Sequence, residues 1–385
     1  MRGHFHAFQL AILRFVRFVG GFISCHSECI TDLLWGRASI PQLRGAPHPH
    51  DETITGVRMA KRIQFNAHGG PEVLNWVDFE LADPTEHEIQ VENRAIGINY
   101  IDTYVRSGLY PTGHFPSGLG TEAAGVVTRV GSAVTRFTPG DRVVYCQAAL
   151  GAYSERHNVA EERLMLLPDA ISFEQAAASF LKGLTTQYLL RQTYKVKPDE
   201  TFLFHAAAGG VGLIACQWAK ALGAHLIGTV GSPEKAARAK NAGAWATINY
   251  QQEDIAQRVM ELTAGEKVGV VYDSVGKATW EASLDCLRRQ GLMVSFGNAS
   301  GPVTNIDLSI LNKKGSLFVT RPSLFGYITN RQELETASAE LFSLLASGAI
   351  KVDVPEQQQF ALKDASKAHQ VLESRATHGS SLLIP

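Results

Sequence analysis

The 385-residue sequence predicts an α/β fold, in which a six-stranded doubly wound parallel sheet accompanies a mainly β domain. Three observations lead to this prediction. Apolar, β-rich runs recur at regular intervals from residue 201 onward, and a glycine loop follows the first of them. Residues 59 to about 183 instead contain short strands separated by glycine and proline turns, which is typical of antiparallel β structure.

Six strand-like runs define the parallel sheet. They occupy residues 202–204, 225–228, 246–248, 268–272, 292–296 and 316–319. Their centres lie at residues 203, 226, 247, 270, 294 and 318, so successive centres are 21 to 24 residues apart. That interval accommodates a strand, a turn and a helix. Ser232 and Pro233 form a typical helix start, and Gly243 is an expected end of the same helix.

The glycine loop at residues 207–212 follows the first strand and opens an apolar helix. It matches the pattern G-x-G-x-x-G, except that Ala207 replaces the first glycine. Gly209 and Gly210 lack a Cβ and so let backbone N–H groups approach a pyrophosphate, while Gly212 lets the helix pack on the strand. Because strand, loop and helix occur in this order, we predict a dinucleotide-binding Rossmann domain; the alternative is a purely structural turn.

The end of the second strand favours NADPH over NADH. An NAD site carries Asp or Glu at this point, whereas residues 229–233 contain no carboxylate. Gly231 and Ser232 leave room and a donor for a 2′-phosphate, and Lys235 supplies positive charge. Glu234 falls in the first turn of the next helix, where an acid complements the helix dipole. The alternative for Lys235 is an ordinary solvated lysine.

Charge and cysteine content narrow the class of protein. Lys plus Arg number 36 and Asp plus Glu 37, so the net charge is −1. The chain is therefore not basic enough to bind nucleic acid or an anionic membrane by charge alone. Apolar residues make up 45%, which is ordinary for a globular protein. The cysteines are odd in number and scattered: Cys25, Cys29, Cys146, Cys216 and Cys286. We therefore expect a reducing compartment, the cytoplasm, rather than a disulfide framework.

The first 58 residues differ from the rest. Residues 1–27 contain no Asp or Glu, and Arg14 and Arg17 interrupt an apolar stretch that is too broken for a membrane span or a secretory signal. Residues 41–50 have the composition of a linker. We expect residues 1–58 to be disordered or not native. Three origins remain open: an extension upstream of a true start at Met59, a cleaved targeting peptide, or a functional tail.

Seven segments occur in an order that characterises one superfamily: residues 97–104, 106–111, 120–125, 140–143, 206–212, 272–276 and 379–384. On these segments the sequence resembles the medium-chain dehydrogenase/reductase superfamily and, within it, the zeta-crystallin-like NADPH:quinone oxidoreductases. The resemblance covers residues 59–385, which is 327 of 385. It implies a GroES-like catalytic domain from residues 59–184 and 324–385, a Rossmann domain from residues 185–323, and a homodimer joined through the edge strand at residues 316–320.

The resemblance also raises the question of metal. The alcohol-dehydrogenase branch of the superfamily holds zinc with a cysteine and a histidine, whose positions are Asn99 and Thr121 here. Neither side chain offers the thiolate or imidazole that zinc prefers. No cysteine lies between Cys29 and Cys146, so the family's structural zinc lobe is missing as well. We expect no zinc, with Glu122 kept as a hydrogen-bonded structural carboxylate.

By resemblance, the acceptor lies between the domains. Asn99, Tyr104 and Tyr110 are the implied catalytic residues, because a tyrosine can donate to a carbonyl oxygen or stack on a flat quinone; alternatively, the tyrosines simply pack at the domain boundary. Thr185 is expected after a helix break at Gly183. The predicted cofactor-binding residues are Tyr100, Ile101, Asp102, Thr103, Tyr104, Thr185, Gly209, Gly210, Val211, Gly212, Gly231, Ser232, Lys235, Tyr250, Ser274, Phe296, Gly297, Asn298, Ala299 and Arg375.

Together these patterns predict metal-free hydride transfer from NADPH to a quinone. Two alternatives stay open: an NADPH-dependent reductase of αβ-unsaturated aldehydes or ketones, and a protein that binds NADPH without turnover. The expected partners are a small-molecule quinone or enone and a second copy of the chain, with no nucleic acid and no membrane span. We expect His68, His114 and His205 to be structural or exposed rather than catalytic.

Overall fold

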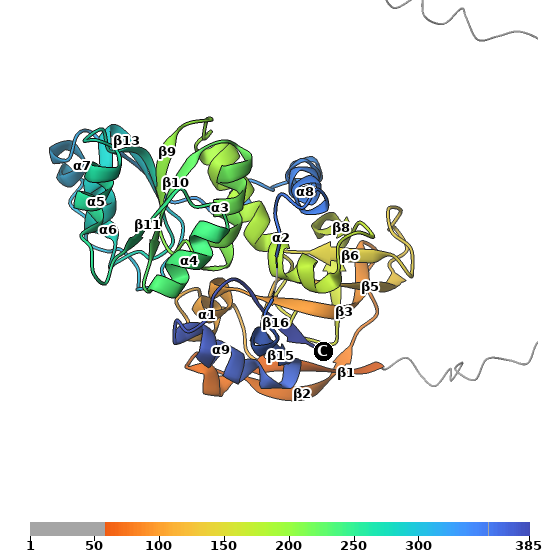
Figure 1. The fold of residues 1–385 in the computed structure, drawn as a ribbon. Coiled ribbons are helices and arrows are strands. Elements are labelled where there is room, and N and C mark those ends of the chain that lie inside the picture. The colour runs from red at the N-terminus through yellow and green to blue at the C-terminus, as the bar shows by residue number, and fades with distance from the viewer. Residues whose placement is uncertain (1–57, 353) are drawn as a thin grey trace, which may run out of the picture. The chain divides into compact units, whose positions relative to one another are not determined.

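The computed structural model describes residues 58–352 and 354–385 (Figure 1). The expectation for residues 1–58 therefore lies outside the described residues, apart from Arg58, where β1 begins. In the described part of the chain, no helix is long and apolar enough to cross a membrane.

A six-stranded parallel sheet forms one side of the structure, in the order β11-β10-β9-β12-β13-β14. Its strands are β9 (Thr201–Phe204), β10 (His225–Val230), β11 (Ala246–Asn249), β12 (Val268–Asp273), β13 (Leu287–Ser295) and β14 (Phe318–Thr320). Every residue of the central strand β12 is buried, as a parallel strand covered on both faces requires. The strand order reverses between β9 and β12, the point at which doubly wound sheets bind their ligands. The predicted α/β fold is confirmed.

The helices of this part follow the strands in turn. They are α3 (Gly210–Ala221), α4 (Pro233–Asn241), α5 (Ile255–Leu262), α6 (Trp280–Asp285) and α7 (Ser309–Lys313). The predicted start of α4 is confirmed, because the Ser232 hydroxyl caps the helix by accepting from the Lys235 N–H at 3.2 Å.

A seven-stranded sheet forms the other side, in the order β15-β16-β3-β5-β6-β8, with β7 also paired to β3. The strands are β3 (Glu88–Ile98), β5 (Ala123–Val130), β6 (Arg142–Tyr145), β7 (Arg156–Ala160), β8 (Leu164–Leu166), β15 (Gln359–Ala361) and β16 (Ser381–Ile384). Strand β16 pairs antiparallel with β3, so a distant segment completes this sheet. A smaller sheet contains β1 (Arg58–Phe65), β2 (Asn75–Leu81) and β4 (Ser117–Gly118).

The remaining helices accompany the seven-stranded sheet or link it to the other: α1 (Tyr100–Ser107), α2 (Phe173–Tyr188), α8 (Arg331–Ala346) and α9 (Ala365–Glu373). A π-helical turn, Leu189–Thr193, continues α2. Short 3-10 turns span Pro71–Val73, Glu161–Arg163, Leu324–Gly326, Glu356–Gln358 and Leu362–Asp364.

Helix α2 is continuous through Gly183, so the predicted break at that residue is wrong. A Cβ at Gly183 would lie 2.5 Å from Leu341 Cδ1 of α8. The glycine therefore serves close packing between two helices and does not end one. Phe180 of α2 stacks on Phe342 of α8, with ring centroids 5.8 Å apart. One hydrophobic cluster around α2 includes residues of both large sheets, which fixes their mutual position in Figure 1.

Candidate active site

Strand β3 carries Asn99 to the first turn of α1, where the two sheets meet. The Asn99 N–H donates to Asp102 Oδ2 at 2.8 Å, which ties the start of the helix. The Asn99 amide then donates through Nδ2 to Glu122 Oε2 at 2.7 Å. Asn99 is 6% exposed, so these bonds hold a nearly buried side chain in one orientation.

A buried chain of hydrogen bonds, from Arg106 through His369 and Tyr153 to Asp102, supports this turn. Tyr153 donates its hydroxyl proton to Asp102 Oδ2 at 2.9 Å, and His369 Nε2 lies 3.1 Å from the same hydroxyl. His369 Nδ1 lies 2.9 Å from Arg106 NH1. Arginine only donates, so Nδ1 is the acceptor and Nε2 carries the proton that reaches Tyr153. Burial and the Arg106 charge lower the pKa of His369 to about 3, which keeps the ring neutral.

Asp102 is predicted to contact the cofactor, but the structure commits its carboxyl to Asn99 and Tyr153. The side chain is 1% exposed, and burial raises its pKa to about 7. Its contribution is therefore to hold the α1 turn, from which the backbone of residues 100–104 can face a ligand.

Replacing Asp102 with asparagine should change how stability depends on pH. In the folded protein the carboxyl keeps its proton up to about pH 7, whereas the unfolded chain loses it near the ordinary aspartate pKa of 3.8. The wild type should thus lose up to a few kcal/mol of stability between pH 4 and pH 7 from this group, and Asp102→Asn should not. Both hydrogen bonds use one oxygen, which asparagine retains. Urea unfolding across this range checks the result; parallel curves for the two proteins would contradict it.

Glu122 and Lys182 form a buried ion pair beside Asn99. Glu122 is fully buried and accepts from the Leu181 N–H at 2.6 Å, as well as from Asn99. Lys182 Nζ lies 3.8 Å from Glu122 Oε2. Burial raises the pKa of Glu122 and lowers the pKa of Lys182, and each charge opposes the shift of the other. The expected hydrogen-bonded Glu122 is present, whereas Lys182 was not predicted.

Tyr104 and Tyr110 bridge from α1 and its following loop to the end of β13. The Asn298 N–H donates to the Tyr104 hydroxyl at 2.9 Å, and the two tyrosine rings meet edge to face at 5.4 Å. The Asn298 amide, oriented with its oxygen toward Tyr110, accepts from the Tyr110 hydroxyl at 3.2 Å and from Arg321 at 3.0 Å. Burial raises the pKa of Tyr104 to about 12, so the phenol keeps its proton at neutral pH.

These bonds distinguish the two phenols. Tyr110 already donates to Asn298, while the Tyr104 proton has no acceptor among the described residues. Tyr104 is therefore the better placed donor toward an incoming oxygen.

The glycine loop occupies the switch point of the six-stranded sheet. Gly209 is the N-cap of α3, and a Cβ on Gly212 would lie 2.4 Å from the Ala206 carbonyl oxygen. Gly379, far along the chain, donates its N–H to the Ala208 oxygen at 3.0 Å and pairs with Gly209 as a parallel bridge. The loop thus leads into the N-terminus of a twelve-residue helix, and its glycines let backbone N–H groups approach a ligand closely. This arrangement fits a pyrophosphate.

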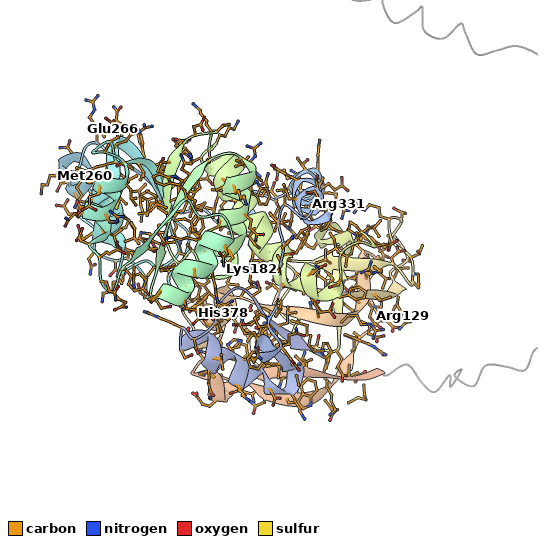
Figure 2. All side chains as sticks on the ribbon, in the orientation of Figure 1. Arg129, Lys182, Met260, Glu266, Arg331 and His378 are labelled. Atoms are coloured by element: carbon orange, nitrogen blue, oxygen red, sulfur yellow. The ribbon has the colours of Figure 1, made fainter. Side chains whose placement is uncertain are left out.

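At the end of β10 the structure brings together the residues predicted for the phosphate and adenosine. Lys235 Nζ donates to the Arg375 carbonyl oxygen at 2.7 Å. A Cβ on Gly231 would lie 2.5 Å from the Tyr250 hydroxyl. His378 completes this group: burial first, then the nearby Arg238 and Lys235 charges, lower its pKa. Figure 2 labels His378 on the C-terminal segment. The charges present fit a 2′-phosphate.

The other predicted cofactor residues lie in several elements. Ser274, Phe296, Gly297 and Ala299 lie together after β12 and β13, where the Ala299 N–H donates to the Ser274 oxygen at 3.2 Å. Thr185 does not follow a helix break; it lies within α2 and its hydroxyl donates to the Leu181 oxygen at 2.7 Å. Ile101, Thr103 and Val211 sit in the first turns of α1 and α3, and the Tyr100 hydroxyl donates to the Leu372 oxygen at 3.3 Å.

Prediction from sequence missed Lys182, His378, Gly379 and Arg321. Lys182 had a local signal, a single charge inside the apolar run at residues 176–184. The others had none, because they reach the site only through the fold. Among the predicted structural histidines, His205 is fully buried and hydrogen-bonds Thr229 and Ser283 at 3.0 and 2.9 Å.

Metal ligands are not gathered at this site. Asn99 turns its amide nitrogen to Glu122, and within residues 58–352 and 354–385 no group of three or more His, Cys, Asp or Glu side chains could hold an ion.

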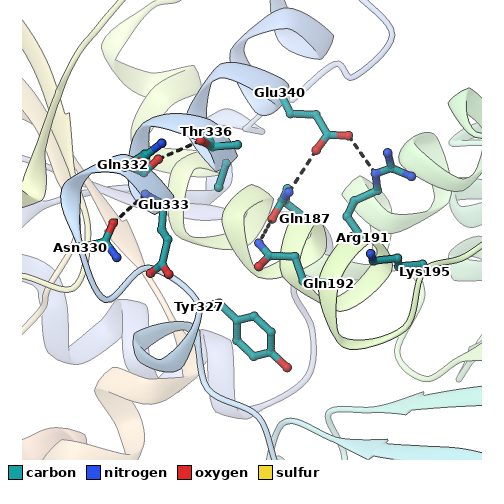
Figure 3. Close-up of a pocket in the computed structure, with 11 residues that line it drawn as sticks. Gln187, Arg191, Gln192, Lys195, Tyr327, Asn330, Gln332, Glu333, Thr336 and Glu340 are labelled. Carbon is teal, nitrogen blue, oxygen red and sulfur yellow. Dashed lines mark hydrogen bonds and ion pairs between the residues drawn. The ribbon is translucent and has the colours of Figure 1, made fainter. Parts of the chain in front are cut away.

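A pocket of about 590 Å³ lies elsewhere, over α2, its π-helical turn and α8 (Figure 3). Its polar side chains are occupied with one another: Glu340 accepts from Gln187 and from Arg191, each at 3.0 Å. None of the predicted site residues lines it. We assign the candidate active site to the meeting of α1, α3 and the end of β13 and not to this pocket.

Comparison with known proteins identifies the family. The family described as alcohol dehydrogenase GroES-like domain matches residues 85–191, and the one described as zinc-binding dehydrogenase matches residues 210–343. The chain is 73% identical over 327 residues to the quinone oxidoreductase of Salmonella typhimurium, covering 85% of this chain and 100% of the relative. It is 43% identical over 323 residues to a 2-haloacrylate reductase of Burkholderia, covering 82% and 96%.

A solved structure agrees with this assignment. The Escherichia coli quinone oxidoreductase complexed with NADPH is 70% identical, with a TM-score of 0.84 and coverage of 85% of this chain and 100% of that chain. The fold, the glycine loop and the sequence identity lead to one conclusion: this chain belongs to the quinone oxidoreductase family of the medium-chain, zinc-type dehydrogenase superfamily.

Proposed function

We propose that this protein reduces quinones by hydride transfer from NADPH without a metal. The observation that carries the proposal is the convergence of three features at the carboxyl-terminal ends of strands in the six-stranded sheet. The glycine loop, the Lys235 and Arg375 group, and the pair of Tyr104 and Tyr110 all lie there. NADPH, when bound, supplies the hydride, and the protein aligns the acceptor, excludes water and donates to the oxygen that gains charge.

The chain's own residues divide the work of binding. The first turn of α3, with Gly209 and Gly212, would hold the pyrophosphate, and Ser232 with Lys235 the 2′-phosphate. Asn99 and Tyr104 would face the acceptor, with Tyr104 as hydrogen-bond donor. Asn99 and Thr121 replace the soft ligands that zinc requires, so reduction of an electron-poor acceptor suits this site better than alcohol oxidation.

A panel of quinones and αβ-unsaturated carbonyls with NADPH tests the proposal. Consumption of NADPH with quinones at much higher kcat/KM than with enones supports it. A preference for enones would favour the second candidate, which the 43% identity to a 2-haloacrylate reductase makes specific. Tight NADPH binding without consumption in the presence of any acceptor would instead indicate a binding protein.

Lys235→Ala should weaken NADPH binding and leave NADH binding unchanged. The lost contact is a charge-assisted bond to phosphate, worth about 1.5–3 kcal/mol, or about ten- to a hundredfold in Kd. Fluorescence titration with both cofactors measures the ratio. The matched control is Lys240→Ala, an exposed lysine at the other end of α4. An equal loss of NADPH and NADH affinity would show that Lys235 does not recognise the phosphate.

Tyr104→Phe should lower kcat for quinone by about ten- to a hundredfold, somewhat less than the loss of a full oxyanion-hole donor. Steady-state kinetics at saturating NADPH measures it. Tyr188→Phe removes a buried phenol that stacks on Tyr327, a residue lining the pocket at α2 and α8, and serves as the control. If Tyr104→Phe and Asn99→Ala leave both turnover and quinone affinity unchanged, the acceptor lies elsewhere.

We also infer a cytoplasmic homodimer with the domain boundaries stated above, residues 59–184 with 324–385 and residues 185–323. Strand β14 supports the dimer, because it is the edge of the six-stranded sheet and leaves Phe318 60% exposed. Sedimentation of the wild type and of Phe318→Lys tests the interface; an unchanged dimer in the variant would exclude this edge.

A further inference from the structure

Lys182 is a buried cation that the proposed reaction has not yet used. It lies on α2 and is 6% exposed, and its Nζ has no hydrogen-bond partner among the described residues (Figure 2). Its closest charge is Glu122, at 3.8 Å, too far for a hydrogen bond. Three N–H donors thus remain unsatisfied in the interior, a costly arrangement unless something else enters to accept from them.

The direction of the side chain identifies the part of the site that Lys182 serves. A Cβ on Gly210 would lie 2.8 Å from Lys182 Cδ and 2.9 Å from Cε, so methylene groups face the glycine loop. The nitrogen extends beyond them to Glu122 Oε2, the same oxygen to which Asn99 Nδ2 donates. The methylene groups of Lys182 therefore lie next to the glycine loop, where the pyrophosphate is expected, and its ammonium group lies toward Glu122 and Asn99, where the acceptor is expected.

A second orphaned group lies beside it. The Thr121 hydroxyl, next in sequence to Glu122, is buried and also lacks a partner within the described part of the chain. The residue before Glu122 in the chain and the cation nearest its carboxylate thus each hold an unsatisfied polar group.

We propose that Lys182 is a catalytic residue that binds the acceptor's carbonyl oxygen and protonates it after reduction. The inference rests on the proposed quinone reduction. Addition of one hydride gives the quinone two electrons and leaves a hydroquinone monoanion. The Lys182 N–H bond then breaks, its proton passes to the anionic oxygen, and its electron pair stays on nitrogen. Lys182 regains a proton from the medium, so each turnover takes up one H⁺, and neutral hydroquinone leaves.

Glu122 has a distinct role in this arrangement. It is a positioning residue, since it attracts the ammonium, orients Asn99 and receives the Leu181 N–H without reaching the acceptor itself. Glu122 and Asp102 are the carboxyl groups whose charge acts on Lys182. Removing Lys182 alone would leave Glu122 as an uncompensated buried charge, which is strongly destabilising.

The decisive variant is therefore the neutral pair Glu122→Gln with Lys182→Met. Glutamine can accept from Leu181 through its oxygen and donate to a turned Asn99 amide, and methionine keeps the apolar stem. If Lys182 acts on the acceptor, kcat with quinone at saturating NADPH should fall about a hundredfold or more relative to Glu122→Gln alone, which turns Asn99 in the same way but keeps the lysine. The Kd for NADPH and the urea midpoint should differ little between these two variants. Lys195→Met, an exposed lysine in the Figure 3 pocket, is the control and should behave as wild type.

A measurement without turnover separates this role from a structural one. 4-Nitrophenol resembles the reduced acceptor and changes its absorption when it ionises. Bound to wild-type protein loaded with NADP⁺, it should ionise at a pH about one unit lower than in water, a tenfold preference for phenolate. The double variant should lose this shift.

Three outcomes would overturn the proposal. They are unchanged kcat in the double variant, a weakened Kd for NADPH with normal kcat at saturation, and an unchanged ionisation of bound 4-nitrophenol. The first two would assign Lys182 to charge balance and to the cofactor phosphates, respectively. Failure of the proposed function is recognised separately, because the wild type itself would then consume no NADPH with any quinone.

Discussion

Gly212→Ala is expected to weaken NADPH binding by about ten- to a hundredfold and to destabilise the fold. The new Cβ would lie 2.4 Å from the Ala206 oxygen and 2.7 Å from two backbone atoms of Ala207. None of these is the end of a flexible side chain, so α3 or the loop must move. Overpacking of this kind costs about 1–3 kcal/mol. If the loop moves to relieve the contact, the cost appears as weaker NADPH binding. Fluorescence titration and urea unfolding measure both effects.

Two glycines provide matched controls. A Cβ on Gly209, in the same loop, meets only the Ala206 oxygen at 3.2 Å, so Gly209→Ala should cost less stability in urea unfolding than Gly212→Ala. A Cβ on Gly326 meets nothing within 4 Å, and Gly326→Ala should leave cofactor affinity unaltered. Wild-type affinity in Gly212→Ala would show that close packing of α3 is not needed for binding.

Arg106→Met should produce the largest loss of stability, about 3–5 kcal/mol. The guanidinium is 2% exposed and donates to the Gly69 oxygen, to His369 and, through two nitrogens, to Glu373 at 3.1 and 2.7 Å. Methionine fills the space but leaves these acceptors without a donor. His369 also loses its charged neighbour, so its pKa should rise from about 3.

Urea unfolding measures the stability of Arg106→Met, and proton NMR titration follows His369. The control is Glu373→Gln, whose side chain is 37% exposed in the wild type and should cost no more than about 1 kcal/mol. A variant as stable as wild type would mean that water replaces the lost donor, and the chain from Arg106 to Asp102 would then not support the α1 turn.

Sequence patterns predicted what depends on neighbouring residues. The six parallel strands, the capped start of α4 and the glycine loop each combine local chain chemistry with a regular spacing, and the structure contains all three. Lys235 could be selected for the same reason, because the absence of a carboxylate after β10 is visible in a few consecutive residues.

What escaped prediction depends on distant contacts. A glycine such as Gly183 often marks the end of a helix, but here it is needed because Leu341 of another helix packs against it. The resemblance implied that residues 324–385 join the domain of residues 59–184, but no local spacing indicates that β16 pairs with β3 and so brings Gly379 and His378 into the site. Lys182 was visible as a charge in an apolar helix, but its significance required knowing that Glu122 and Asn99 lie beside it.

The pairing of β16 with β3 also orders events during synthesis. The six-stranded sheet uses a continuous stretch of chain, from Thr201 to Thr320, and can assemble as soon as that stretch leaves the ribosome. The seven-stranded sheet includes earlier residues, but one side of β3 lacks its partner strand β16 until Ser381–Ile384 has been translated. The sheet whose first strands are synthesised early is thus completed last. Part of one side of β3 stays unpaired until synthesis reaches β16.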